Sequence, residues 1–217
     1  MSLGSTITLR SMMNLDIPSH VTLVAVSKTK PVSAIQSVYA LGVREFGENR
    51  VQELVEKNEQ LPCDINWHAI GHLQTNKVKF VVGLADLIHA VDSEKLFKAI
   101  EKQATKMNIV QNILLQVHIA EESSKFGFSA EELDALHTSG AFKSDSVRVR
   151  GLMGMATFTD DEQQVRSEFR SLKTLFDKHA GGDFDTLSMG MSGDYKIAIE
   201  EGSTMVRIGS AIFGNRG

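Results

Sequence analysis

The sequence alternates between short apolar runs and longer amphipathic segments along nearly its whole length. The short runs are rich in β-branched residues, as buried strands are, and the longer segments repeat apolar residues at helical spacing. Strands are expected at residues 21–28, 45–47, 65–70, 87–91, 112–119, 147–155, 186–189 and 205–213. Helical segments are expected near 33–41, 50–60, 76–82, 93–105, 130–137, 160–179 and 194–200. This alternation predicts a parallel sheet covered by helices.

Two architectures compete for such a pattern. Eight strand–helix units in 217 residues suit a compact (β/α)₈ barrel. An open doubly wound sheet usually has fewer strands and a glycine-rich first turn, whereas the first turn here reads "SKTKP". We therefore predict an α/β fold, a single (β/α)₈ TIM barrel over residues 21–217. Residues 1–20 are expected to form an N-terminal segment that is helical or partly disordered.

Composition narrows the range of partners. The net charge is −4 and the isoelectric point about 6.0, which gives no electrostatic basis for binding nucleic acid or an anionic membrane. The apolar runs are too short for a transmembrane helix, and the N-terminus lacks a signal-peptide core. The single cysteine, Cys63, is expected to be a reduced thiol. We expect a cytoplasmic protein without nucleic-acid or membrane partners.

The first predicted strand ends on Lys28, where a barrel carries its active site. Strand alternation would place Lys28 on the inward face with Val24 and Val26. A partly dry barrel mouth disfavours the ammonium form and makes the amine a nucleophile suited to imine formation with a carbonyl. A solvated lysine just beyond the strand is the alternative that spacing leaves open.

Two glycine–serine pairs follow the last two predicted strands. Barrels often bind phosphate with these loops, and here they carry Ser192 with Gly193 and Gly209 with Ser210. Hydroxyl and backbone N–H groups at these positions, with the dipole of the helix expected near residue 194, would suit an anion.

Arg207 shares the inward face of the last strand with Gly209. An inward arginine needs an acceptor, which could be an internal carboxylate, such as Glu48 or Asp92, or a heteroatom of a ligand.

Other polar residues are expected to be structural. His68 and His72 lie on a strand and its turn, so they lack the helical spacing of a metal-binding histidine pair, and we predict no metal site. Thr75 is expected to cap the helical segment that follows it, Ser93 to cap the segment after 92, and Ser129 to form a capping box with Glu132.

Seven ordered motifs resemble one known family, the pyridoxal phosphate homeostasis proteins, also called the YggS/PROSC family, which are alanine racemase-like. They are "LVAVSKTKP" (23–31), "FGENRVQE" (46–53), "WHAIGHLQTNK" (67–77), "KFGFS" (125–129), "GLMGMA" (151–156), "LSMGMSGDY" (187–195) and "VRIGSAIFG" (206–214). The resemblance implies the fold type III barrel of pyridoxal 5′-phosphate (PLP) proteins, without the second β domain of the racemases.

The resemblance also assigns roles to residues. Lys28 would hold PLP covalently as an imine, and Asn49 would lie near the cofactor. Arg207 would face the pyridine nitrogen and, because arginine rarely gives up a proton, leave the ring unprotonated and a weak electron sink. The phosphate would be bound by four residues: Ser192, Gly193, Gly209 and Ser210.

The function implied is vitamin B6 homeostasis: holding and supplying PLP, with no catalytic residue, apo PLP-dependent enzymes as partners, and a monomeric or weakly dimeric state. The alternative is a PLP-dependent amino-acid racemase, which needs a second acid–base group besides Lys28. The two tyrosines, Tyr39 and Tyr195, lie in predicted helical regions and are poor candidates. A class I aldolase that uses Lys28 on a phosphorylated sugar is a third possibility.

Overall fold

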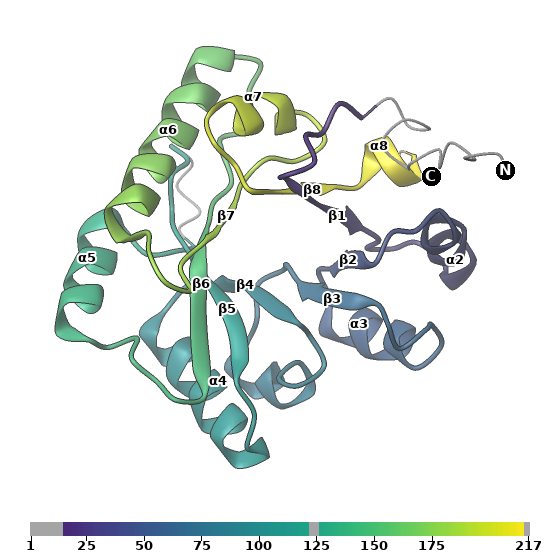
Figure 1. Cartoon of the computed structure of the whole chain (residues 1–217), viewed down its shortest axis with the longest axis horizontal. Coiled ribbons are helices and arrows are strands. Elements are labelled where there is room, and N and C mark those ends of the chain that lie inside the picture. The colour runs from purple at the N-terminus through teal and green to yellow at the C-terminus, as the bar shows by residue number, and fades with distance from the viewer. Residues whose placement is uncertain (1–14, 122–125, 215–217) are drawn as a thin grey trace, which may run out of the picture.

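Eight parallel strands close into a barrel in chain order, with the last strand beside the first and helices around the outside (Figure 1). The computed structural model describes residues 15–121 and 126–214. The strands are β1 (Thr22–Val26), β2 (Glu45–Glu48), β3 (Asn66–Ala69), β4 (Leu87–Val91), β5 (Gln111–Gln116), β6 (Val147–Met153), β7 (Thr186–Ser188) and β8 (Met205–Ile208). The predicted (β/α)₈ barrel is therefore confirmed.

Helices occupy the connections between the strands. They are α2 (Val32–Ala40), α3 (Val51–Asn58), the 3₁₀ helix η1 (Thr75–Phe80), α4 (Glu94–Met107), α5 (Ala130–Ser139), α6 (Glu162–His179), α7 (Tyr195–Glu200) and α8 (Ser210–Phe213). Two helix starts are as predicted: the Ser93 hydroxyl accepts from the Leu96 N–H at the start of α4, and Ser129 forms a capping box with Glu132 on α5.

Two local expectations are wrong. Thr75 does not cap a helix, because it is the first residue of η1, which follows Gln74 without a side-chain cap; the short connection is a 3₁₀ helix, the form usual for such brief pieces. The last predicted strand, 205–213, ends at Ile208, and the chain turns at Gly209 into the short helix α8.

The apolar core has two layers. The larger layer lies between the sheet and the helices and includes Leu23 and Ala25 of β1. The smaller layer fills the barrel interior and consists of Val24, Leu87, Ala90, Leu114, Met153 and Met205. The opposite faces taken by Val24 and by its neighbours match the alternation expected for β1.

Of the predicted N-terminal segment 1–20, residues 1–14 lie outside the described residues. Leu15 and Ile17 are buried against the outer core layer.

None of the helices described here combines the length and apolar character needed to cross a bilayer.

Gly71, after β3, is required by the close approach of the β2 exit. A Cβ at Gly71 would lie 2.2 Å from the Asn49 carbonyl oxygen, whereas a Cβ at Gly193 would meet nothing within 4 Å. We expect Gly71→Ala to lower the free energy of unfolding by about 2 kcal/mol, because backbone must move to relieve the overlap. Gly193→Ala is the matched control and should be nearly neutral. Denaturant unfolding measures both, and equal stabilities would contradict the packing described here.

Candidate functional site

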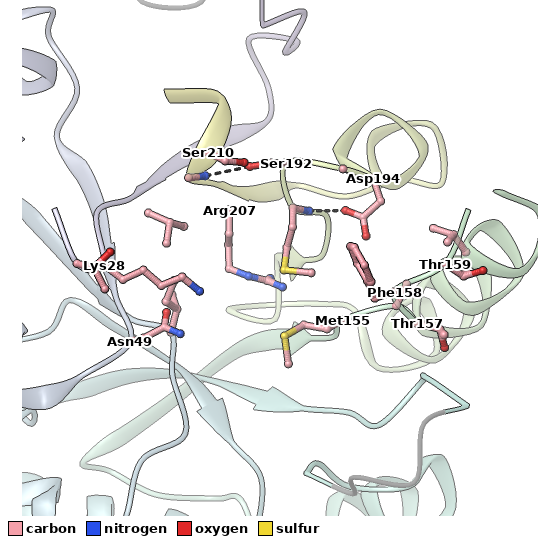
Figure 2. A pocket seen from close by; sticks show the side chains of 18 of the residues that line it. Lys28, Asn49, Met155, Thr157, Phe158, Thr159, Ser192, Asp194, Arg207 and Ser210 are labelled. Carbon is pink, nitrogen blue, oxygen red and sulfur yellow. Dashed lines mark hydrogen bonds between the residues drawn. The ribbon is translucent and has the colours of Figure 1, made fainter. Parts of the chain in front are cut away.

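A cavity of about 720 Å³ opens at the carboxyl ends of the strands (Figure 2). All seven predicted site residues line it: Lys28, Asn49, Ser192, Gly193, Arg207, Gly209 and Ser210. The pairing of β1 with β8 places the two ends of the barrel sequence side by side. This cavity is therefore the candidate functional site.

Lys28 reaches into this cavity from the end of β1, toward the side where Asn49 lies (Figure 2). Val26 lines the same cavity, and Ser27 between them is fully buried on the other face. The side-chain alternation that the sequence predicted for this strand thus continues past its last hydrogen-bonded residue.

A buried ion pair lies behind the strand end that carries Lys28. The Lys57 ammonium of α3 donates to the Glu48 carboxylate at 2.7 Å and to the Ser27 carbonyl at 2.9 Å, and the Ser27 hydroxyl donates to the same Glu48 oxygen at 2.6 Å. Burial raises the pKa of Glu48 against these hydrogen bonds. The second Glu48 oxygen is buried with no hydrogen bond from any described residue. The residue before Lys28 is therefore fixed by a charge inside the protein.

The residue after Lys28 is held by the same cluster. Thr29 adopts a left-handed φ of 64°, which is unfavourable for a threonine. Its backbone N–H donates to Glu53 at 2.7 Å, and Glu53 also accepts from Lys57 at 3.2 Å. Burial opposes ionisation of Glu53, yet the Thr29 and Lys57 hydrogen bonds together hold its pKa below the usual value.

We call Lys57, Glu48 and Glu53 the Lys57 brace. It fixes the peptide groups on both sides of Lys28, so the amine projects from a backbone with little freedom to move. Sequence reasoning missed this role. Glu53 and Lys57 are spaced four apart on a helix, a pattern that usually marks a solvated surface pair. The signal was that Glu53 lies in the same motif as Glu48, with Lys57 one helical turn further on.

Arg207 lies beneath the cavity and is almost fully buried. Its guanidinium donates to the Ser188 hydroxyl at 2.6 Å, to the Ser188 carbonyl at 2.8 Å and to the Gly154 carbonyl at 3.0 Å. Burial lowers the pKa of Arg207 to about 10, and the nearby Asp194 carboxylate opposes that shift.

An internal salt bridge from Arg207 to Glu48 or Asp92, one of the two sequence interpretations, is wrong. Glu48 is paired with Lys57, and Asp92 bonds His72 at 3.0 Å. Glu48 faces outward to α3 because alternation on β2 turns it away from the barrel axis. Among the described residues, no carboxylate forms an ion pair with Arg207, and two of the five guanidinium N–H groups have no recorded acceptor.

The loops after β7 and β8 are joined to each other at the cavity edge. The Gly209 N–H donates to the Ser192 hydroxyl at 3.2 Å. The backbone N–H groups of Gly193 and Ser210 have no acceptor recorded within the described chain. Burial raises the pKa of the neighbouring Asp194 carboxyl, against the hydrogen bond from the Met191 N–H and the charge of Arg207. The helix expected from residue 194 is only the short α7, so these hydroxyl and N–H groups, not a helix dipole, are the donors available.

Another wall of the cavity combines apolar side chains with Thr157, Thr159 and Asp160. It includes Met155 and Phe158, which the sequence analysis did not single out as site residues, and Phe158 is 96% exposed. Such a wall suits a flat ring placed between charged ends.

His68 and His72 each bond to other side chains of the protein. His68 bonds Glu45 and His89 inside the barrel, whereas His72 bonds Asp92 at the rim. The described residues contain no cluster of three metal-binding side chains.

Comparison with known proteins places the chain in a family. Residues 8–217 match the family described as "Alanine racemase, N-terminal domain". Proteins named pyridoxal phosphate homeostasis protein are 42% identical over 198 residues in Aquifex aeolicus and 40% identical over 210 residues in Escherichia coli K12. These alignments cover 89% and 92% of this chain, and 86% and 87% of those proteins.

Solved structures agree with this placement. PipY of Synechococcus elongatus with PLP bound is 34% identical, with a TM-score of 0.84, and the match covers 94% of this chain and 97% of that one. Alanine racemase of Clostridium difficile, 12% identical, matches with a TM-score of 0.77 over 94% of this chain and 58% of that one, and shares the fold alone. The chain belongs to the alanine racemase N-terminal domain family. Within that family it belongs with the pyridoxal phosphate homeostasis proteins.

The Lys57 brace predicts a large and pH-dependent stability effect. Lys57→Met should lower the free energy of unfolding by about 3 kcal/mol at neutral pH, because it leaves Glu48 buried without its cation. The deficit should shrink as pH falls, since the raised pKa of Glu48 lets the folded state take up a proton that removes the unpaired charge. Denaturant unfolding across pH measures both effects.

Lys98→Met is the matched control, because Lys98 forms a half-exposed pair with Glu101 on α4. Its cost should stay below about 1 kcal/mol. Similar losses for the two variants, or a Lys57→Met deficit that grows in acid, would contradict the role assigned to the brace.

Proposed function

We propose that this protein binds PLP, holds it through an imine on Lys28, and keeps it available to other proteins instead of using it for committed catalysis. The observation that carries the proposal is that one cavity is lined by a lysine, a buried arginine and two hydroxyl-bearing, glycine-containing loops. The PLP-bound relative PipY and the shared name of the curated relatives support it.

The cavity matches the three parts of PLP. The anionic phosphate suits the Ser192 and Ser210 hydroxyls with the nearby backbone N–H groups, and the aldehyde suits the Lys28 amine on the facing side (Figure 2). The unused N–H groups of Arg207 suit the pyridine nitrogen, which accepts a hydrogen bond. Asn49 and the wall that includes Met155 complete the surroundings of the ring.

The chemistry required of the chain is small. Lys28 would hold PLP covalently through its amine, and the aldehyde oxygen would be released as water. PLP supplies the electrophilic aldehyde and a ring able to withdraw electrons. Arg207 donates to the ring nitrogen and retains its own proton, so the ring stays neutral and withdraws electrons weakly. This favours holding the cofactor over carbanion chemistry.

A racemase needs a second acid–base group facing Lys28. The Tyr39 hydroxyl donates to Asp64 at 2.6 Å on the outer surface, and neither tyrosine nor any histidine is among the described residues that line the cavity. This observation favours the homeostasis function over the racemase. Its proposed setting is the cytoplasm, as a monomer or weak dimer, with apo PLP-dependent enzymes receiving the cofactor.

Lys28→Ala should abolish the visible absorbance of the protein loaded with PLP, because no imine can form. Lys98→Ala, which removes an exposed lysine on α4, should leave the spectrum unchanged. Borohydride reduction followed by digestion and mass spectrometry should place the added mass of reduced PLP on Lys28. Retained absorbance in Lys28→Ala, or the added mass on another residue, would overturn the proposal. A colourless protein that traps a phosphorylated sugar on Lys28 would support the aldolase instead.

Racemisation separates the two PLP functions. We expect the loaded protein to invert no amino acid faster than free PLP does, because neither a tyrosine nor a histidine is among the described residues that line the cavity. Chiral chromatography of a panel of L-amino acids after incubation measures this. Inversion that is lost in Lys28→Ala would establish the racemase and refute the proposed function.

A further inference from the structure

Polar side chains form a continuous hydrogen-bonded chain through the barrel interior. It runs from Glu45 on β2 through His68 on β3, His89 on β4 and Ser188 on β7 to Arg207 on β8. The successive contacts are 2.6 Å, 2.8 Å, 3.1 Å and 2.6 Å. We call these five residues the interior chain. Because β4 and β7 are not neighbours in the sheet, the bond from His89 to Ser188 must cross the barrel.

Four residues of the interior chain are buried in a region where apolar side chains could be placed at a lower free-energy cost. His89 and Ser188 have no exposed surface, and His68 and Arg207 are 3% and 4% exposed. Elsewhere the same interior is filled by aliphatic residues and methionine, and burying polar groups carries a free-energy cost that hydrogen bonds only offset. Packing therefore does not explain why histidines occupy these positions.

The hydrogen bonds of the interior chain have one consistent direction. Arginine can only donate, so the Ser188 hydroxyl accepts from Arg207. The hydroxyl hydrogen of Ser188 has no other acceptor among the described residues, so the arrangement that satisfies every group sends it to His89 Nδ1. His89 then carries its hydrogen on Nε2 and donates to His68 Nδ1. His68 in turn carries its hydrogen on Nε2 and donates to the Glu45 carboxylate.

The charge states fit this direction. Burial, with the nearby charge of Arg207, holds the pKa of His89 well below its usual value, so its ring is neutral. Burial would raise the pKa of Glu45, but hydrogen bonds from His68 and Asn66 outweigh it and the carboxylate is ionised. The interior chain thus links a cation at the cavity to an anion at the opposite end of the barrel, and each link polarises the next.

We propose that Glu45 is a positioning residue for Arg207: acting through His68, His89 and Ser188, it orients the guanidinium beneath the cavity. Arg207 forms no ion pair with a described carboxylate. The Asp194 carboxylate is near enough to favour its charge, and the interior chain adds a second negative charge at the other end of the barrel. The effect of Arg207 on the pyridine nitrogen of PLP rests on the proposed function. The direction of the hydrogen bonds along the interior chain does not depend on PLP binding.

The first experiment needs no cofactor. Nitrogen-15 NMR of the unloaded protein, with the two rings assigned by substitution, should find His68 and His89 neutral and protonated on Nε2. In Glu45→Leu, which removes the terminal acceptor, His68 should shift toward its other tautomer. A hydrogen on Nδ1 of His89, or a doubly protonated His68, in the unmodified protein would overturn the proposal.

The second experiment uses the loaded protein and three variants. Glu45→Leu should move the absorption band of bound PLP and increase the rate at which hydroxylamine removes the cofactor. Glu45→Gln keeps an acceptor but loses the charge, and should show a smaller change. Asp86→Asn is the matched control, because Asp86 is an acidic residue at the start of β4 that bonds the Trp67 N–H and not the interior chain.

These outcomes separate the proposal from the proposed function. If the unmodified protein binds no PLP, the proposed function fails while the NMR experiment still tests the interior chain. If PLP binds and Glu45→Leu leaves both band and removal rate unchanged, Glu45 does not act on Arg207. Equal effects of Glu45→Gln and Asp86→Asn would mean that the loss of any negative charge changes the cofactor's behaviour, and that the interior chain is not responsible. Should Glu45→Leu fail to fold, Glu45→Gln and the unmodified protein retain both tests.

Discussion

The pairing of β1 with β8 is the constraint on which the site depends. In this register Val24 lies opposite Arg207, so the residues that follow on the two strands emerge together at the same end of the barrel. Lys28 and Gly209, which are far apart in sequence, come to line one cavity for this reason. Gly209 lies at the junction, where a Cβ would be 3.2 Å from the Val26 carbonyl oxygen. A shift of one residue in the pairing of β1 with β8 would exchange the inward-facing and outward-facing side chains of β1, and would remove Lys28 from the cavity.

Closure brings the two sides of the cavity together, but it does not fix the amine. The chain turns sharply after Lys28, through a threonine in a conformation that costs free energy. The Lys57 brace holds the peptide groups on both sides of Lys28. The unfavourable backbone conformation of Thr29 persists because these hydrogen bonds stabilise it. A nucleophile on a loop with this support keeps its geometry in the unloaded protein. A protein that must accept and release the same ligand repeatedly benefits from such rigidity, since little ordering is required at each binding event.

Much of this arrangement could be predicted from the sequence, because it follows from local periodicity. Strand–helix alternation predicted the barrel. Strand exits pointed to Lys28 and the two glycine–serine pairs, and side-chain alternation pointed to Arg207, whereas Asn49 was named through the family resemblance; all seven line the cavity. What could not be predicted depends on pairing across the barrel or on the choice of a partner. Glu48 appeared as a possible partner of Arg207 because both lie near strand ends, yet the pleat directs it outward to Lys57. His68 and His89 each interrupt a buried apolar strand, and that interruption was the available signal; which atoms they would bond depends on strand spacing.

The two buried networks meet different physical requirements. The Lys57 brace acts over short distances on the backbone, where direct contact between opposite charges is strongest and one carboxyl oxygen can remain unpaired. In the proposed function, the interior chain acts on an arginine that also uses some of its N–H groups to bind a ligand. A carboxylate placed directly against Arg207 would stabilise the cation but would occupy the N–H groups and add negative charge near the ring. Carrying the anion to the far end of the barrel through neutral imidazoles retains the polarisation and leaves the cavity side of the guanidinium open. Separation of the charges by the full interior is therefore what allows one arginine to be both buried and available.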